Sequence, residues 1–214
     1  MIVSLHVYVA FLAAGVALNL TPGPDMLYVL ASGSRAGPRS GVLAACGVGA
    51  GCAVHTFAAA TGLSALLVSS ATAFTAVKWA GAAYLVYLGG KALLAPAALA
   101  ATPAPGARAE AGPAERVFRR AVVTNVLNPK VAIFFLAFVP QFVDPARGRI
   151  WLQFLVLGLS FCVTGTLVNA VVGVAAGKVR RTMDARPRVA RALDRITGAV
   201  FLGLGLRLVF APRS

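Results

Sequence analysis

In this 214-residue chain, Asp25 is the only acid within a long apolar stretch and Lys130 is the only basic residue near the centre of one, and each lies directly beside a proline. Asp25 ends the sequence NLTPGPD, which begins at Asn19, and Lys130 ends NVLNPK, which begins at Asn125. If these stretches cross a lipid bilayer, both charges are costly to bury. Such charges usually mark a transport route, a proton relay or a buried ion pair. We therefore expect Asp25 and Lys130 to line one polar cavity.

The neighbouring prolines predict breaks in the helices that carry these charges. A proline has no backbone N–H, so Pro22, Pro24 and Pro129 would release the carbonyls of Leu18, Leu20 and Asn125. In hydrocarbon such carbonyls must be buried in protein or face a watery cavity. The half-helix that begins near Gly23 would present free N–H groups to a carboxylate. The alternative is that the prolines only kink the helices and shape the bundle.

We predict a transport site made from the residues of both breaks and from one histidine. Asp25 could bind a substrate ammonium, carry a coupling proton or pair with Lys130, and Lys130 would lie near a carboxylate. His55 is a candidate for proton transfer because imidazole exchanges protons near neutral pH. The full predicted set is Asn19, Thr21, Pro22, Gly23, Pro24, Asp25, His55, Asn125, Asn128, Pro129 and Lys130.

The composition indicates that the elements positioning this site are transmembrane helices. Hydrophobic residues make up 59% of the chain, charged residues only 12%, and the mean hydropathy is +0.82. Soluble domains carry roughly 25% charged residues, and a membrane-spanning helix needs roughly 20 apolar residues. We predict an all-α membrane protein of six transmembrane helices, the sixth of them short, over 2–32, 41–68, 72–94, 117–142, 150–177 and 196–210.

The six expected helices divide into two halves. Residues 1–94 and 117–214 each hold three helices, and residues 95–116, rich in Ala, Pro and Gly, form a flexible cytoplasmic linker. The first and fourth helices, each the first of its half, contain the proline breaks. Three spans per half give the halves opposite orientations, which is the 3+3 inverted repeat of many secondary transporters.

The basic residues predict an orientation. The net charge is +14, and fourteen of the twenty Lys and Arg residues fall in the loops after the first, third and fifth helices, against five on the opposite side. The positive-inside rule puts the first group in the cytoplasm and both termini outside. These clusters lie between apolar runs, which favours contact with anionic lipid over nucleic acid. The basic segment 178–195 is either a short amphipathic helix on the inner leaflet or a solvated loop.

Small residues suggest how the helices pack. Glycines recur four apart at Gly47 and Gly51 and at Gly173 and Gly177. This spacing lets helices approach closely, either within one bundle or between the subunits of a homodimer. Three cysteines, Cys46, Cys52 and Cys162, lie in apolar runs without metal-ligand spacing, and we expect them to be small buried side chains.

The motifs resemble those of the LysE/RhtB family of amino-acid exporters. The likeness covers nearly the whole chain and rests on NLTPGPD at 19–25, KWAGAAYLVYLGGK at 78–91, NVLNPK at 125–130, FF at 134–135 and PQF at 140–142. The resemblance implies six helices in an inverted arrangement within the bacterial cytoplasmic (inner) membrane. It also implies export of amino acids or related metabolites, driven by the proton gradient. No cofactor is expected, and the chain has no GxxxxGK[ST] loop.

Three other functions are open at this point. A metal exporter of the wider superfamily is one, although two histidines and no acidic cluster make a poor set of metal ligands, and we predict no metal site. An enzyme would need a nucleophile and a base at one depth, and no nucleophile stands out, so we expect no enzymatic activity. A non-transporting membrane subunit would have no use for charged, broken helices.

Overall fold

The computed structural model describes residues 2–94, 113–176 and 178, with a few single positions between 192 and 203. These residues form helices and helical turns joined by short non-helical breaks, so the predicted all-helical class is confirmed. The first half contains α1 (Leu5–Leu20), α2 (Pro24–Ala36), α3 (Pro38–Ala58), the π-helical turn η1 (Ala59–Leu63), α4 (Ser64–Ser69) and α5 (Ala71–Leu94). The second contains α7 (Ala114–Val126), α8 (Pro129–Ile133), the π-helical turn η2 (Phe134–Phe138), the 3-10 turns η3 (Val139–Phe142) and η4 (Pro145–Arg147), and α9 (Ile150–Val174).

Several of these helices are long and apolar enough to cross a membrane. The continuous rod Pro38–Leu66 has 29 residues and α9 has 25. Two bent pairs qualify if each is counted as one span: α1 with α2, bent by 53°, and α7 with Pro129–Phe142, bent by 47°. The described part of the chain thus holds two to four candidate spans. The helix α5 is not among them, although its 24 residues are enough to cross.

Some predicted segments lie outside the described residues. These are the sixth helix, 196–210, apart from isolated positions, most of the linker, 95–112, and the basic segment, 178–195, apart from a few residues. The six-helix count, the division into halves and the inverted repeat therefore stay predictions. The first predicted helix, 2–32, is longer than expected, because α2 continues to Ala36.

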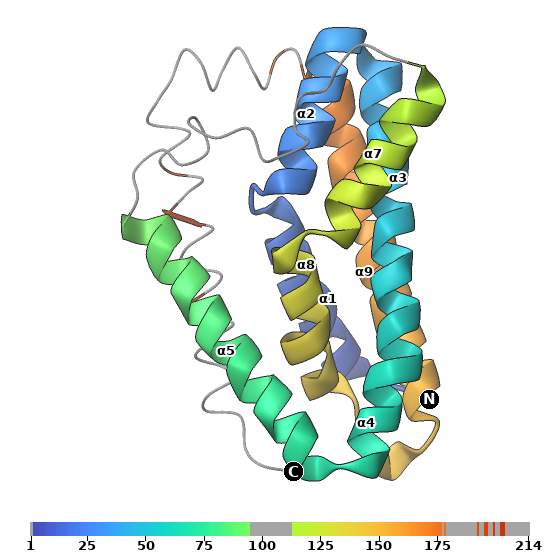
Figure 1. The fold of residues 1–214 in the computed structure, drawn as a ribbon, viewed down its shortest axis with the longest axis vertical. Helices are drawn as coiled ribbons and strands as arrows, with labels where there is room; N and C mark the ends of the chain where they lie inside the picture. The colour runs from blue at the N-terminus through green and yellow to red at the C-terminus, as the bar shows by residue number, and fades with distance from the viewer. Residues whose placement is uncertain are drawn as a thin grey trace.

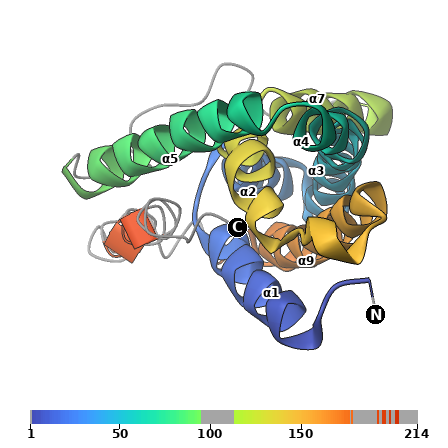
Figure 2. The same cartoon turned by 90° about the horizontal axis from the view of Figure 1, so that it is seen from below.

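The bundle is built around α3, which packs against α2, α7 and α9, while α1 packs on α9 (Figure 1). Tyr28 of α2 donates a hydrogen bond to the carbonyl of Val117 in α7, 3.1 Å away, and so joins the two halves of the chain. The helix α5 runs along one side of the bundle, as the view from below shows (Figure 2), and contacts α4, α8 and η2.

Glycines allow the close approach of α3 to its neighbours. A Cβ added at Gly47 would lie 2.6 Å from the carbonyl oxygen of Phe118 in α7, and one at Gly173 would lie 2.6 Å from the carbonyl carbon of Gly41. Any side chain at these positions would push the helices apart. Both glycines therefore serve packing within the chain, and the homodimer stays a separate prediction. Gly177 lies outside the described residues.

Aromatic side chains fill the interior between α1, the α8–η3 segment and α9. The rings of Phe134 and Phe161 stack with centroids 4.2 Å apart, and Phe11 meets Phe142 edge-on at 5.2 Å. All four rings are buried. Cys52 and Cys162 are also buried, as expected, but Cys46 is exposed, because none of the helices that the structure describes covers its position on α3. The expectation that all three cysteines are buried is wrong for Cys46.

The helix contact at Gly47 predicts a stability difference between two alanine substitutions. We expect Gly47→Ala to lower the melting temperature of the detergent-solubilised protein by several degrees, because overpacking costs about 1–3 kcal/mol. Gly90→Ala in α5 is the matched control, since its Cβ meets nothing within 4 Å. That variant gains helix propensity and should keep or raise the melting temperature. Equal melting temperatures for the two variants would contradict the close contact.

Candidate functional site

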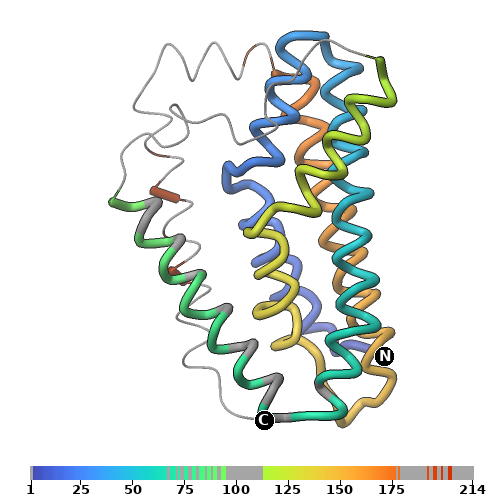
Figure 3. Tube along the Cα trace, in the orientation of Figure 1, coloured from blue at the N-terminus to red at the C-terminus, as the bar shows by residue number. Residues whose placement is uncertain are grey.

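The two interrupted helices come together inside the bundle. The first is interrupted between Leu20 and Pro24, and the second between Val126 and Pro129. Both interruptions lie near mid-height, as the tube shows (Figure 3). Pro24 and Pro129 each occupy the first turn of the helix that follows, where the missing N–H costs nothing. The breaks thus place backbone polar groups and the two charged residues at one level.

Lys130 satisfies the backbone of the other break. Its ammonium donates to the carbonyl oxygens of Leu18 and Thr21, each 2.8 Å from Nζ, and to the hydroxyl of Thr21 at 2.6 Å. The Leu18 carbonyl is the one that Pro22 deprives of its helical partner. This carbonyl still accepts the backbone N–H of Thr21 at 3.1 Å, and Lys130 adds a charge-assisted donor to it. Thr21, which is buried, also donates its hydroxyl to Leu18.

Two asparagines of the second break hold Asp25. Its Oδ2 accepts hydrogen bonds from Asn125 Nδ2 at 2.9 Å and from Asn128 Nδ2 at 2.8 Å. The Oδ1 of Asn128 in turn caps α8 by accepting from the backbone N–H of Lys130, 3.0 Å away. Asn128 therefore joins the acid of one break to the lysine of the other. The side-chain amide of Asn128 thus links Asp25 to Lys130, and both charged residues are only partly buried.

His55 reaches the same cluster from α3. Its Nε2 lies 3.2 Å from the carbonyl oxygen of Asn125, which is the carbonyl that Pro129 releases. When Nε2 carries the proton, the imidazole donates to this oxygen. The ring stacks on Phe135 with centroids 5.8 Å apart. Gly51 makes room for the cluster, because a Cβ there would lie 2.7 Å from Asn125 Cβ.

The cluster contains two acceptor atoms without a donor. Asp25 Oδ1 and Asn125 Oδ1 are both buried and accept no hydrogen bond from any residue that the structure describes. Leaving such atoms unsatisfied costs about 1–3 kcal/mol each, and more for a charged group. Most buried polar atoms in proteins have a partner. The arrangement is suited to receiving a cation with several N–H donors.

The remaining predicted residues have different surroundings. Asn19 faces α9, donating to Thr164 Oγ1 at 3.1 Å and lying where Gly165 leaves space, so it positions α1 rather than joining the cluster. Pro22 is buried. Gly23 borders Lys130, since a Cβ there would lie 3.7 Å from Nζ.

An apolar groove of about 330 Å³ begins at His55. Its lining includes both π-helical turns, η1 and η2, and such turns are frequent at functional sites. Sequence reasoning missed this groove, because no pattern distinguishes its alanines and leucines from the many others in the chain. The lining residues are His55, Ala58, Ala59, Gly62, Leu63, Leu66, Ala132, Phe135 and Leu136.

Metal ligands do not gather around the cluster. Across the residues that the structure describes, no group of three or more His, Cys, Asp or Glu side chains could hold a metal ion. The polar groups at the breaks are amides, carbonyls, the Thr21 hydroxyl, one carboxylate and one ammonium. Such a set suits hydrogen bonding to an organic ion better than the binding of a soft metal.

Comparison with known proteins agrees with the motifs and the geometry. Residues 16–211 match the model of the LysE type translocator family. An uncharacterized membrane protein of Vibrio cholerae is 34% identical over 207 residues, covering 97% of this chain and 98% of the relative. Leucine efflux proteins of Klebsiella pneumoniae and Salmonella typhimurium are 32% and 30% identical, each covering 94% of this chain and 93% of the relative.

No solved structure matches the chain significantly. The family match spans both breaks, and the relatives align over almost their full length. With its long apolar helices, the chain is a multi-pass membrane protein. It belongs to the LysE type translocator family of membrane transporters.

Proposed function

We propose that this protein exports amino acids with apolar side chains across the bacterial inner membrane by proton antiport. The observation that carries the proposal is the set of charges and unsatisfied acceptors at the two breaks. One carboxylate and one ammonium, both within the bundle, match the opposite charges of a zwitterion. A substrate bound between them adds no net charge to a site that is costly to charge.

The ammonium of the substrate would bind at Asp25 Oδ1 and Asn125 Oδ1. Both atoms are buried and lack donors, and an ammonium group supplies three. Its carboxylate would lie at the start of α2, beside Gly23 and Lys130. There the N–H groups of Asp25 and Met26 have no carbonyl partner within the helix, and the positive end of the dipole attracts an anion.

The side chain of the substrate would enter the groove beyond His55. The groove is lined almost entirely by apolar groups and adjoins the cluster through the contact of His55 with the Asn125 carbonyl. The names of two relatives, leucine efflux proteins, support an aliphatic amino acid as the substrate. A groove of this volume has room for a leucine side chain.

Competition at Asp25 offers a physical basis for antiport. A carboxylate that carries a proton binds an ammonium much more weakly, so Oδ1 holds either a proton or the substrate. Exchange of the two on opposite sides of the membrane would couple export to the proton gradient. His55 is placed to pass protons, since it contacts the same break.

The charge distribution supports a cytoplasmic location for the end where α2 meets α3. Arg35, Arg39 and the arginines at the start of α7 gather at this end, opposite the N-terminus (Figure 1). The positive-inside rule then puts the N-terminus on the periplasmic side. In the same proposal, the linker 95–116 is cytoplasmic, and the two halves form an inverted repeat with one broken helix each.

Transport by the purified protein tests the central proposal. We expect proteoliposomes to move radiolabelled leucine when a proton gradient is imposed, and to stop when a protonophore removes it. Asp25→Asn should lower the rate roughly tenfold or more, because it removes a charge-assisted partner of the ammonium. Glu115→Gln is the control, since that acid is highly exposed, at the start of α7. Leucine movement that ignores the gradient would rule out antiport, and full activity of Asp25→Asn would remove Asp25 from the site.

Substitution within the groove tests the assignment of the side chain. Ala132→Phe should fill the groove and lower leucine export roughly tenfold relative to alanine export, because the larger side chain no longer fits. Ala83→Phe on an exposed face of α5 is the matched control. The measurement is the ratio of leucine to alanine exported from loaded cells, which is independent of expression level. An unchanged ratio would place the side chain elsewhere.

Labelling of intact cells tests the orientation. In a background with Cys46→Ala, single cysteines would be introduced by Ala146→Cys and Arg39→Cys, both at exposed positions. A membrane-impermeant maleimide should label the first variant in intact cells and the second only after lysis. The buried thiols of Cys52 and Cys162 should stay unlabelled. The reverse pattern would invert the proposed topology.

A further inference from the structure

A polar cavity is lined by residues near the N-terminus, by the loop before α9 and by the first turn of α9. The N-terminus and the start of α9 lie at the same end of the bundle (Figure 1). The volume of the cavity is about 390 Å³. It is separated from the helix breaks by the segment Pro129–Phe142, which spans roughly 20 Å at 1.5 Å per residue. The cavity is therefore distinct from the cluster around Asp25. Its polar lining residues are Ser4, His6, Gln141, Asp144, Arg147 and Gln153.

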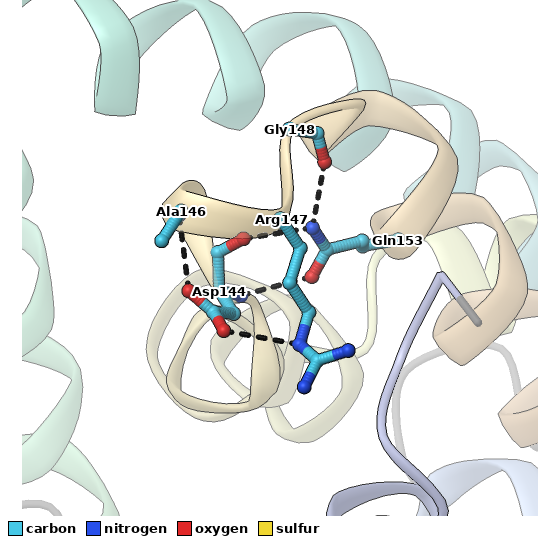
Figure 4. Close-up of polar contacts among 5 residues, drawn as sticks. All are labelled: Asp144, Ala146, Arg147, Gly148 and Gln153. Carbon is cyan, nitrogen blue, oxygen red and sulfur yellow. Dashed lines mark hydrogen bonds and ion pairs between the residues drawn. The ribbon is translucent and has the colours of Figure 1, made fainter.

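One buried side chain holds the loop beside this cavity. Gln153 is fully buried and accepts a hydrogen bond from the backbone N–H of Asp144 at 2.9 Å. Its amide nitrogen donates to the carbonyls of Asp144, at 2.9 Å, and Gly148, at 2.8 Å (Figure 4). These three bonds fix the loop between η3 and α9. The loop therefore holds its charged side chains in a set geometry.

Arg147 has donors available in this geometry. Its Nε donates to Asp144 Oδ2 at 3.1 Å, while its two terminal nitrogens bond to none of the residues drawn (Figure 4). The side chains of Arg147 and Asp144 are 42% and 50% exposed, so a solute from water can reach them. The carboxylate of Asp144 aims the guanidinium, leaving its terminal nitrogens for a two-point contact with another carboxylate.

Gln141 supplies a matching acceptor. Its amide nitrogen donates to the carbonyl of Ala137 at 3.0 Å, which fixes the orientation of the amide. Its Oε1 is buried and has no hydrogen-bond partner among the described parts of the chain. A buried acceptor without a donor is costly, and Gln141 is one of the residues that line the cavity. An acceptor and a free guanidinium edge in one cavity match the two ends of a zwitterion.

We propose that this cavity is a second binding site for the head group of an amino acid, on the side where the substrate is released. The carboxylate of the amino acid would bind the terminal nitrogens of Arg147, and its ammonium would bind Gln141 Oε1 and the nearby carboxylate of Asp144. The inference rests on the proposed function, because it takes the transported amino acid as the ligand. The segment from Asn128 to Gln141 then connects the two sites directly.

Equilibrium binding of radiolabelled leucine to the full chain in lipid nanodiscs tests this site. We expect two leucines per wild-type chain, and one per chain for Arg147→Gln, whose affinity at the second site falls roughly tenfold or more. The leucine that Arg147→Gln still binds shows that the variant is folded. Gln141→Leu should give the same loss, because it removes the acceptor. Arg149→Gln, which removes a neighbouring exposed charge outside the cavity lining, should retain two.

The outcomes separate this inference from the exporter proposal. A wild-type chain that binds one leucine, lost in Asp25→Asn and kept in Arg147→Gln, overturns the second site and leaves the central site standing. Equal loss in Arg147→Gln and Arg149→Gln would also overturn it, since the effect would then come from general surface charge. A wild-type chain that binds no leucine contradicts both proposals.

Discussion

The structure depends on how backbone carbonyls are satisfied where two helices are broken inside the bundle. A helix without proline would pair these carbonyls internally, and hydrocarbon supplies no donor in place of the missing N–H. Here Lys130 donates to the Leu18 carbonyl, and His55 lies within hydrogen-bonding distance of the Asn125 carbonyl. Each break is thus stabilised by a side chain from elsewhere in the fold. The Leu18 and Asn125 carbonyls also accept the backbone N–H groups of Thr21 and Asn128, so the side chains add to local backbone hydrogen bonds.

This arrangement explains why a costly ammonium is tolerated at mid-height. Lys130 is held by three oxygens of the opposite break, and Asn128 links it to Asp25. The remaining acceptors, Asp25 Oδ1 and Asn125 Oδ1, lack donors. The ammonium of Lys130 therefore donates to three oxygens, whereas the two acceptors beside Asp25 are left for a ligand. That asymmetry is suited to a ligand that brings an ammonium.

Glycine and π-helical turns supply the space around this cluster. Gly51 lets Asn125 approach α3, and Gly165 leaves space for Asn19 beside α9. The π-helical turns η1 and η2 line the groove that begins at His55. A regular helix would turn different side chains toward one another at these positions. Close packing and local irregularity together determine the shape available to a substrate.

Local sequence patterns predict a helical, apolar chain, the positions of the helix breaks and the two charges beside the prolines. These features follow from local chemistry, because proline removes a donor wherever it stands and a charge is visible against an apolar run. Other contacts follow from the packing of the helices: Lys130 binds the Leu18 and Thr21 oxygens, Asn19 faces α9, and Phe135 stacks on His55. These contacts join residues more than 70 positions apart. Their partners depend on how the helices pack, which no local pattern specifies.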